Sequence, residues 1–593
     1  MLRSEKKRTV LLAVVFAALM LSACGGSGGK GESAAAEASQ TQGAASDTET
    51  DKASTDTEAL DDTEDAASEA DYGTEGSDKA ASGAMEGQDE GLALHVALKS
   101  HVFSEYDEED MGLLYSLSYE EPYIRDEGYE ELKASLEKRA SERFKRIEIE
   151  REQLMSAAKA GKELSSSDGF FGYTSEGSIN VLRADSRVLS FMTEAYSYTG
   201  GAHGNGGVTA EVYDTKSGKR LGVSDVIADK AGLESYITAK LEEDYGSQDM
   251  LFEGWEQWVH DEIAELPYEA EPIEAMEGDD YMGVSASNEP HDTSAEPLAM
   301  GLDFALTPEG MRVYFSPYEI GPWALGTITV DIPYTEEGLG FNEAYLPLAE
   351  QTVWPLEAYE ELELDVDEDG LKEQIGLSFQ AQEDQSQSTY TLFVTDGEDT
   401  ASLNGVCGYG MDKAYIMKEP EGGYVFYGEC KSNNDWRYLS MADITEMWEE
   451  RSEVAAAEPS EYYESFYDNV PVSAESFYLS TRGSLLSTVS ISREHRVGTD
   501  GFPEAVQEDF LYDDFELTAK QDIKGTEVSS GEAAEISAGA KLRAVSTDEA
   551  SYAVLEDMES GARIRVGIDG SDWPHTIDGT DIEELFDGLI FAG

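Results

Sequence analysis

The amino-acid sequence predicts a multidomain chain whose N-terminal module is of the α+β class, an antiparallel sheet with helices, and whose later domains are mostly β. Three observations predict this fold class. An N-terminal stretch is nearly free of large apolar residues, which predicts a disordered linker. A long helical run lies among strand-like segments in the first half of the chain. From about residue 353, short strand-like runs separated by turn residues predominate.

The first residues have the pattern of a bacterial export signal. An apolar run from Thr9 to Met20 follows a basic segment, and Leu21-Ser22-Ala23-Cys24 closes it with small residues. This ending resembles the lipobox of bacterial lipoproteins, which implies that the signal peptide 1–23 is removed and that Cys24 is diacylated. The chain is then anchored by lipid, with palmitate among the expected acyl groups, at the outer face of the cytoplasmic membrane of a Gram-positive bacterium. An uncleaved membrane helix is the alternative, but the run is shorter than the ~20 residues that a bilayer crossing needs.

Residues 24–91 are rich in Ala, Ser, Thr, Gly, Glu and Asp. Such a segment buries too little apolar surface to offset the entropy lost on ordering, so it is predicted to be disordered. A flexible coil of about 65 residues spans roughly 45 Å, and its like charges extend it further. We therefore expect the folded part of the chain to stand away from the membrane, within or beyond a cell-wall layer.

The chain is strongly acidic. It has 124 Asp and Glu residues against 41 Lys and Arg residues, which gives a net charge of −83 at pH 7. Such a surface would repel the phosphates of a nucleic acid, so nucleic-acid binding is excluded. Surface acidity serves solubility, and it would also attract a basic partner over long range. The sequence leaves both interpretations open.

The first folded unit is predicted to span residues 92–349. It begins with the strand-like segment Leu94–Leu98 and continues with a helical run from Tyr129 to about Lys159. Apolar side chains recur in this run at three- and four-residue spacing and predict one buried stripe: Leu132, Leu136, Ala140, Phe144 and Ile147. Basic residues share the helix: Lys133, Lys138, Arg139, Arg143, Lys145 and Arg146. They predict a solvated face with Glu–Lys pairs, with contact to an anionic wall polymer as the alternative.

Four separated motifs follow in this unit. They are Arg183–Ser186, the glycine-rich segment Ser197–Asn205, the turn Ser217–Asp225, and the combination of Phe304–Gly310 with Pro317–Gly326. Taken in this order, the motifs resemble the extracellular PdaC/RsiV-like module, which is shared by peptidoglycan deacetylases and lysozyme-sensing anti-sigma factors. The resemblance covers less than half of the chain. It implies a module that senses or holds cell-wall components.

The chain departs from both kinds of relative in what is attached to the module. Only eight residues precede the apolar run, so we do not expect the sigma-factor-binding segment of the anti-sigma factors. The Asp-Asp and His-x-x-x-His metal constellation of the deacetylase catalytic domain does not occur in the sequence. The sequence therefore predicts the binding module of these proteins without the sigma-factor-binding segment and without the deacetylase catalytic domain.

The ligand-binding candidates come from the second and fourth motifs. They are Tyr198, His203, Asn205, Tyr318, Glu319 and Trp323. Aromatic residues on rigid turns suit an interface anchor, although such residues also pin strand ends in a core. A catalytic His203 would need a nucleophile and an orienting acid, for which Asp185 and Glu211 are the candidates. We expect a structural imidazole and name no catalytic residue.

The second unit, residues 352–525, contains an acidic loop with D-x-D-x-D-G spacing. In calcium loops of this kind, alternate carboxylates converge on one cation and glycine permits the sharp turn. The predicted Ca²⁺ ligands are Asp365, Asp367, Asp369, the carbonyl of Leu371, and Glu373. The loop lacks the twelfth-position glutamate and the flanking helices of an EF-hand, and it resembles the calcium loops of extracellular β-propeller and integrin-type repeats. A plain acidic turn is the alternative.

Two further features lie in the C-terminal half. Cys407 and Cys430 remain once Cys24 is assigned to the lipid, and on an exported chain they are candidates for a disulfide. Residues 526–593 contain short strand-like runs whose pattern loosely resembles a bacterial SH3-like barrel, a fold frequent in wall-binding proteins. A functional inference from that barrel would be analogy only.

Two classes of function are expected. The first is a non-enzymatic surface protein that binds or senses cell-wall glycan or a basic wall-lytic protein such as lysozyme. The second is a peptidoglycan-modifying hydrolase with a site near His203. A purely structural lipoprotein in an envelope complex is a third and weaker hypothesis. The chain resembles the module in four motifs, but we expect neither the sigma-factor-binding segment nor the deacetylase metal constellation. This combination favours the non-enzymatic binding protein.

Overall fold

The computed structural model describes residues 93–591, apart from 109–110, 165–169, 202, 247–249, 265–300, 382–387, 433–436, 451–459 and 463. The chain divides into two units, Met1–Gln88 and Asp89–Gly593, and every element described belongs to the second. The predicted signal peptide, the predicted lipidation site Cys24 and the predicted linker over 24–91 lie outside the described residues. Among the described residues, no helix has the length and apolar character that a membrane crossing requires.

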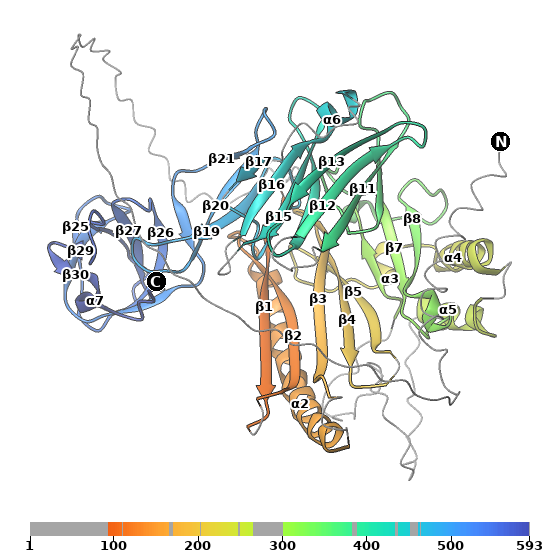
Figure 1. The fold of residues 1–593 in the computed structure, drawn as a ribbon, viewed down its shortest axis with the longest axis horizontal. Helices are drawn as coiled ribbons and strands as arrows, with labels where there is room; N and C mark the ends of the chain where they lie inside the picture. Colours follow the sequence, from red (N-terminus) through yellow and green to blue (C-terminus); the bar gives the residue numbers. More distant parts are fainter. Residues whose placement is uncertain are drawn as a thin grey trace, which may run out of the picture. The chain divides into compact units, whose positions relative to one another are not determined.

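The first module is built on a mixed sheet and one long helix (Figure 1). The strands of this sheet are β1 (Val96–Tyr106), β2 (Leu113–Ile124), β3 (Tyr173–Ala184), β4 (Val188–Tyr198), β5 (Asn205–Asp214) and β18 (Asn469–Val470). They are ordered β18-β1-β2-β3-β4-β5. Within this order β2 and β3 run parallel. Parallel neighbours need a crossover connection, which α2 (Glu130–Leu164) supplies. The α+β class is confirmed, and the predicted antiparallel arrangement is corrected at the β2/β3 pair.

Helix α2 lies along one face of this sheet (Figure 1). Its buried residues are Leu132, Leu136, Ile147, Leu154 and Ala158. Phe144, which was expected in the buried stripe, is 47 % exposed. At 3.6 residues per turn it lies about 120° around the helix from Leu132, so it faces away from the sheet. The same period places positions 139 and 143 within about 20° of Leu132, on the face that meets the sheet.

Arg139 and Arg143 therefore point toward buried carboxylates. Arg139 donates through Nε to Glu211 Oε1 at 2.8 Å and through Nη1 to Glu121 Oε2 at 2.5 Å. Arg143 Nε lies 3.6 Å from Glu121 Oε1. The Arg139 and Glu121 side chains are 10 % and 9 % exposed. The prediction of a solvated basic face is wrong for these two arginines, because ion pairing offsets their removal from water.

The second half of the module is a small sheet with short helices. Its elements are α3 (Val223–Val226), α4 (Lys230–Tyr245), α5 (Trp255–Ala264), β6 (Phe304–Leu306), β7 (Gly310–Phe315), η2 (Trp323–Leu325), β8 (Ile328–Pro333) and η3 (Glu343–Tyr345). The strands are ordered β6-β7-β8. Val188 of β4 and Val212 of β5 belong to the same apolar cluster as these helices and strands. The small sheet thus packs against β4 and β5.

Two β-sheets and a short helix follow. One sheet is β10 (Glu361–Leu364), β11 (Glu373–Ala381), β12 (Ser388–Thr395) and β13 (Thr400–Val406). The other has the order β17-β16-β15-β14-β9 and consists of β9 (Val353–Pro355), β14 (Met411–Lys418), β15 (Tyr424–Lys431), β16 (Arg437–Asp443) and β17 (Ser460–Tyr462). Helix α6 (Ile444–Glu450) adds Trp448 to the core that these sheets share. Cys407 and Cys430 form a disulfide in this core and are fully buried.

The last strands form one extended sheet. They are β19 (Phe477–Arg482), β20 (Ser490–Val497), β21 (Pro503–Ala505), β22 (Phe510–Tyr512), β23 (Glu516–Ala519), β24 (Ile523–Glu527), β25 (Ala533–Ile536), β26 (Lys541–Thr547), β27 (Tyr552–Asp557), β28 (Arg563–Gly567) and β31 (Phe586–Asp587), with β29 (Thr576–Ile577), β30 (Thr580–Asp581) and α7 (Ile582–Leu585) beside them. Leu485 and Ile564 belong to one apolar cluster. The boundary placed between 525 and 526 therefore falls inside a continuous sheet and core. The mostly β character of this region is confirmed, and the SH3-like barrel stays a prediction.

Strand β18 crosses another predicted boundary. It belongs by sequence to the unit 352–525, but it pairs with β1 of the first module in the register Val96↔Val470 and Ala97↔Asn469. Arg125, which directly follows β2, donates to Asn469 Oδ1 and to Asp513 Oδ1 at 2.7 and 2.6 Å. The first sheet is thus completed by a segment from far along the chain.

Candidate functional site

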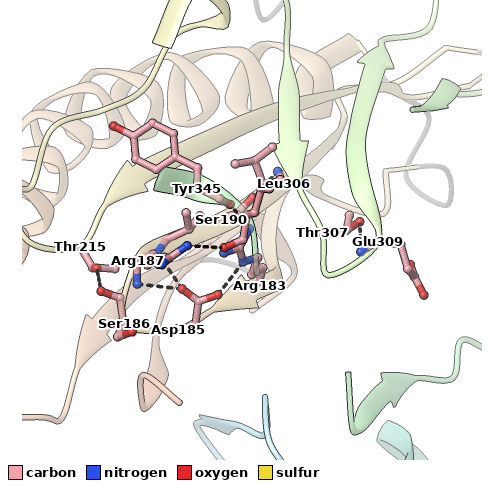
Figure 2. Close-up of polar contacts among 12 residues, drawn as sticks. Arg183, Asp185, Ser186, Arg187, Ser190, Thr215, Leu306, Thr307, Glu309 and Tyr345 are labelled. Atoms are coloured by element: carbon pink, nitrogen blue, oxygen red, sulfur yellow. Dashed lines mark hydrogen bonds and ion pairs between the residues drawn. The ribbon is translucent and has the colours of Figure 1, made fainter. Parts of the chain in front are cut away.

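The first family motif forms the bend between β3 and β4 (Figure 2). Asp185 Oδ1 accepts hydrogen bonds from the amides of Arg187 at 2.8 Å and Val188 at 3.0 Å. Asp185 Oδ2 accepts from Arg183 Nε at 2.6 Å. The carboxylate thus closes the bend by pairing with backbone amides and with one arginine of the same motif.

Arg183 connects this bend to the second half of the module (Figure 2). Its side chain is 3 % exposed. Its Nη1 donates to the carbonyl of Tyr345 at 2.6 Å and to the hydroxyl of Tyr334 at 3.1 Å. The Tyr334 hydroxyl in turn donates to the carbonyl of Thr307, at 3.0 Å. The first motif and the T-P-E-G turn of the fourth motif are therefore parts of one buried polar network.

The third motif is a turn that docks on α2. Gly218 has φ +65°, and a Cβ at this position would lie 2.2 Å from the carbonyl oxygen of Glu131, so only glycine fits. Asp214 Oδ1 accepts from the Ser217 amide at 2.8 Å, and Thr215 Oγ1 donates to the Ser186 carbonyl at 2.6 Å. This motif thus has a structural role.

The second and fourth motifs meet at the edge formed by β5. Ser316 Oγ accepts from the Val208 amide at 2.9 Å and donates to the Val208 carbonyl at 3.1 Å. The loop after Ser316 is also anchored in the core. Ile320 is fully buried, and its carbonyl accepts from the Phe252 amide at 2.9 Å. These contacts fix the loop Pro317–Gly326 beside the glycine-rich segment.

Three rings from these two motifs form what we call the aromatic platform: His203, Tyr318 and Trp323. The imidazole of His203 stacks on the indole of Trp323 with 5.2 Å between ring centroids and 18° between planes. The Tyr318 ring lies 5.9 Å from Trp323. His203 is exposed, Tyr318 is 53 % exposed and Trp323 is partly exposed. Tyr318 is held at φ +71°, which is unusual for a tyrosine and presents its ring at the surface.

Glu319 directly follows Tyr318 of the platform and is only partly exposed. It accepts a hydrogen bond from the Ser316 amide, and at 3.2 Å one from the indole N–H of Trp258 on α5. Burial raises the pKa of Glu319 to about 7, with the Asp303 and Glu262 carboxylates adding to the effect. Burial likewise raises the pKa of Asp303 to about 6. Two acidic groups near the platform therefore titrate close to neutrality.

These raised pKa values predict how stability depends on pH. The folded state holds its proton on Glu319 up to about pH 7, whereas the unfolded chain releases it near the ordinary value of 4.5. Stability should therefore fall as the pH rises from about 4.5 to about 7 and then level off. Glu319→Gln should flatten this decline in melting temperatures measured across that range. The exposed Glu309→Gln is the matched charge change, and an equal effect of both variants would contradict the assignment.

Of the predicted ligand-binding residues, the structure brings His203, Tyr318, Glu319 and Trp323 together. Tyr198 lies at the end of β4, where its hydroxyl donates to the Gly201 carbonyl at 3.2 Å. Asn205 begins β5 opposite Ser197 of β4. These two belong to the frame of the glycine-rich loop. No ring contact within the described residues joins Tyr198 to the platform.

Trp258 lies on α5 and is not among the ligand-binding residues predicted from the sequence. Trp255 is buried together with Val259 and Ile263, at four-residue spacing. Trp258 falls outside this stripe, is 39 % exposed and bonds Glu319. The sequence contained a signal for this position. Trp258 lies one residue before Val259 of the buried stripe, so its side chain points away from the buried face of the helix.

The acids proposed as partners of His203 are engaged elsewhere. Asp185 binds Arg183, and Glu211 binds Arg139. The Nδ1 atom of His203 lies 2.8 Å from the carbonyl oxygen of the adjacent Gly204. Among the described residues, the side chains close enough together to hold a metal ion are those of Asp365, Asp367 and Glu373. His203 is not one of them.

The acidic loop between β10 and β11 gathers part of its predicted ligand set. The carboxylates of Asp365, Asp367 and Glu373 each offer an oxygen, and these oxygens lie within 4.8 Å of one another. Asp369 is exposed, and its carboxylate accepts from the Leu371 amide at 2.8 Å instead. The structure therefore groups three of the four predicted carboxylate ligands. The Leu371 carbonyl stays a prediction.

Comparisons with known proteins bear on the first module. A family model described as deacetylase PdaC matches residues 109–206, and one described as a protein of unknown function (DUF3298) matches residues 224–335. A crystal structure of a DUF3298-family protein from Bacteroides fragilis is 17 % identical and covers 43 % of this chain and 96 % of that protein, with a TM-score of 0.29. Another, from Pseudomonas aeruginosa, is 16 % identical and covers 43 % and 97 %, with a TM-score of 0.27. No protein with a curated description matches the chain.

The two family matches divide the motifs between them. The PdaC match contains Arg183–Ser186 and Ser197–Asn205, and the DUF3298 match contains both parts of the fourth motif. The hydrogen bond from Arg183 to Tyr334 joins the two matched segments directly, and Val208, just after the first segment, donates to Ser316 of the second. Residues 109–206 and 224–335 of this chain therefore form a PdaC/RsiV-like module.

Proposed function

We propose that the PdaC/RsiV-like module is an extracellular, cell-wall-related binding module without enzymatic activity of its own. Its ligand is a cell-wall component or a basic wall-lytic protein such as a lysozyme. The observation that carries the proposal is the aromatic platform, in which rings from two motifs stack at the surface of a rigid frame. Stacked aromatic side chains provide a large contact area and lose little conformational entropy on binding, which is why they dominate protein interfaces.

Charge favours the basic protein as the ligand. The chain carries a net charge of −83, which raises the encounter rate with a cationic partner at low salt. An arginine or lysine of that partner would gain a cation–π contact with Trp323 or Tyr318. A lipid anchor at Cys24 would hold the module where wall-lytic proteins act.

The contacts of His203 support binding over hydrolysis. A general base needs an orienting acid and a nucleophile within hydrogen-bond reach. Asp185 and Glu211 are occupied by arginines, and the imidazole is stacked on Trp323. Among the described residues, these contacts engage elsewhere the two acids that the hydrolase hypothesis names as partners of His203.

A binding titration tests the proposal. The mature chain, immobilised through its C-terminus, is exposed to lysozyme and to peptidoglycan fragments at 20 mM and 300 mM NaCl. We expect saturable binding of at least one ligand, with lysozyme binding weaker at the higher salt because salt screens charge attraction. In parallel, labelled peptidoglycan should release no product with the wild type or with His203→Ala. Absence of binding to both ligands at low salt would overturn the proposal, as would product release that depends on His203.

A further inference from the structure

We infer that the loop between β10 and β11 is a calcium site whose protein ligands are Asp365, Asp367 and Glu373. The oxygens of these three carboxylates lie within 4.8 Å of one another, and the structure holds no ion there. The site lies outside the PdaC/RsiV-like module and does not depend on its proposed function.

The two aspartates are each satisfied on one oxygen only. Asp365 Oδ2 accepts from the Gly370 amide at 3.0 Å, and Asp367 Oδ2 accepts from the indole N–H of Trp448 at 3.1 Å. The Oδ1 atoms of both aspartates are buried and have no hydrogen-bond partner within the described structure. Burying a carboxylate oxygen without a hydrogen-bond partner is unfavourable, so these two oxygens favour a site in which a cation satisfies them.

Glu373 completes the cluster from the first position of β11. It is 3 % exposed, and its Oε2 accepts from the Val366 amide at 2.8 Å. No lysine, arginine or histidine of the described residues forms an ion pair with Asp365, Asp367 or Glu373. Three carboxylates this close repel one another strongly in a partly buried site. A bound cation would remove that repulsion.

The donor set identifies the class of cation. All three ligands are carboxylate oxygens, which suit hard ions such as Ca²⁺ and Mg²⁺ and do not select zinc or copper. The loop turns through left-handed conformations at Glu368 (φ +57°) and Gly370 (φ +86°), so its carboxylates come from a tight and irregular turn. Ca²⁺ accepts irregular geometry of this kind, whereas Mg²⁺ requires near-ideal octahedral ligands and keeps most of its water. Ca²⁺ is therefore the favoured ion.

A cation bound at this loop would strengthen the core that α6 shares with the two sheets around it. Asp367 connects the loop to α6 through Trp448, which is 1 % exposed in the shared core. Glu373 begins β11, and Asp365 directly follows β10. The cation would therefore tie the β10–β11 hairpin to α6. We expect the ion to act on stability and not on the aromatic platform.

Two readouts test the site in the full mature chain after treatment with EDTA. The first is the melting temperature with increasing CaCl₂, because an ion bound only by the folded state stabilises it. The second is Tb³⁺ luminescence excited through tryptophan, since Trp448 contacts the Asp367 carboxylate. The wild type should melt higher with Ca²⁺ than with equal Mg²⁺, and Ca²⁺ should displace Tb³⁺.

The variants are Asp365→Asn with Asp367→Asn, and the matched control is Asp369→Asn. The double variant should lose at least tenfold in Ca²⁺ affinity and most of the Tb³⁺ signal. It should also melt no lower than the wild type without metal, because the repulsion is relieved. Asp369→Asn should respond to Ca²⁺ like the wild type. Equal responses of the two, an unchanged wild-type melting curve, or a stronger effect of Mg²⁺ than of Ca²⁺ would overturn the assignment.

Discussion

Replacing Trp323 by alanine is expected to weaken ligand binding about thirty-fold. Truncation of an interface hot spot costs about 2 kcal/mol or more, which corresponds to that factor. The substitution removes the ring on which His203 stacks and which Tyr318 approaches. The loss should appear in the dissociation constant for lysozyme or for peptidoglycan fragments, measured by interferometry, whichever ligand the wild type binds.

A pair of tyrosines provides the control for this prediction. Tyr318 and Tyr359 are both exposed, by 53 % and 72 %, and both have positive φ, at +71° and +65°. Tyr359 belongs to neither motif of the platform, and its hydroxyl donates to the Phe379 carbonyl at 3.1 Å. Tyr318→Ala should weaken binding at least tenfold and Tyr359→Ala should not. Equal losses in the two variants, or unchanged binding by Trp323→Ala, would show that the platform is not the binding surface.

Arg183→Ala is expected to destabilise the module by about 3 to 5 kcal/mol, because removing one partner of a buried ion pair leaves the other charge unpaired. Arg183 is almost fully buried, and it holds Asp185, Tyr345 and Tyr334 at once. Its loss disconnects the β3–β4 bend from the second half of the module. The measurement is the urea midpoint, followed through near-ultraviolet circular dichroism of the wild type and the variant.

Arg312→Ala is the matched control for this second prediction. Arg312 also makes two hydrogen bonds to an aspartate, Asp331, at 2.6 and 3.1 Å. These side chains are 39 % and 62 % exposed. Exposed ion pairs contribute about 0.2 to 1 kcal/mol, so this variant should unfold close to the wild type. Similar midpoints for Arg183→Ala and Arg312→Ala would mean that the buried network does not hold the module together.

The order of the motifs could be read from the sequence. Which motifs are structural and which supply the proposed binding surface could not. Arg183–Ser186 and the Ser217–Asp225 turn are built from polar residues, which in a single sequence indicate structure and chemistry equally. Their contacts with Tyr334, Ser186 and α2 show a structural role. The three rings of the platform lie at the surface, with Trp323 partly exposed. This separation depends on contacts between segments far apart in the chain.

The spacing of apolar residues predicted where helices and strands occur better than it predicted which elements pair with each other. The helix was expected from its apolar spacing, yet the same spacing also placed Arg139 on the sheet-facing side, which a hydrophobic pattern alone does not register. The parallel pairing of β2 with β3 and the pairing of β1 with β18 are choices among strands that local patterns leave open. The boundary at 525/526 was placed before a run of short strand-like segments, and such a run does not reveal that the sheet continues across the boundary.

The acidic loop shows the same limit at the level of single atoms. The D-x-D-x-D-G spacing located the loop, but alternation alone assigned Asp369 to the shell together with Asp365 and Asp367. In the folded loop the Asp369 carboxylate bonds the Leu371 amide and stays exposed. Glu373 joins the cluster because β11 buries it.

The measurement that tests the central claim most directly is hydrogen exchange of the mature chain with and without saturating lysozyme, and separately with peptidoglycan fragments. The proposed function predicts that one of these ligands slows exchange in peptides that contain His203–Val208 and Ser316–Gly326. Peptides that contain the Asp365–Glu373 loop should be unaffected by either ligand. Unchanged exchange at the platform with both ligands, or protection confined to other surfaces, would contradict the claim.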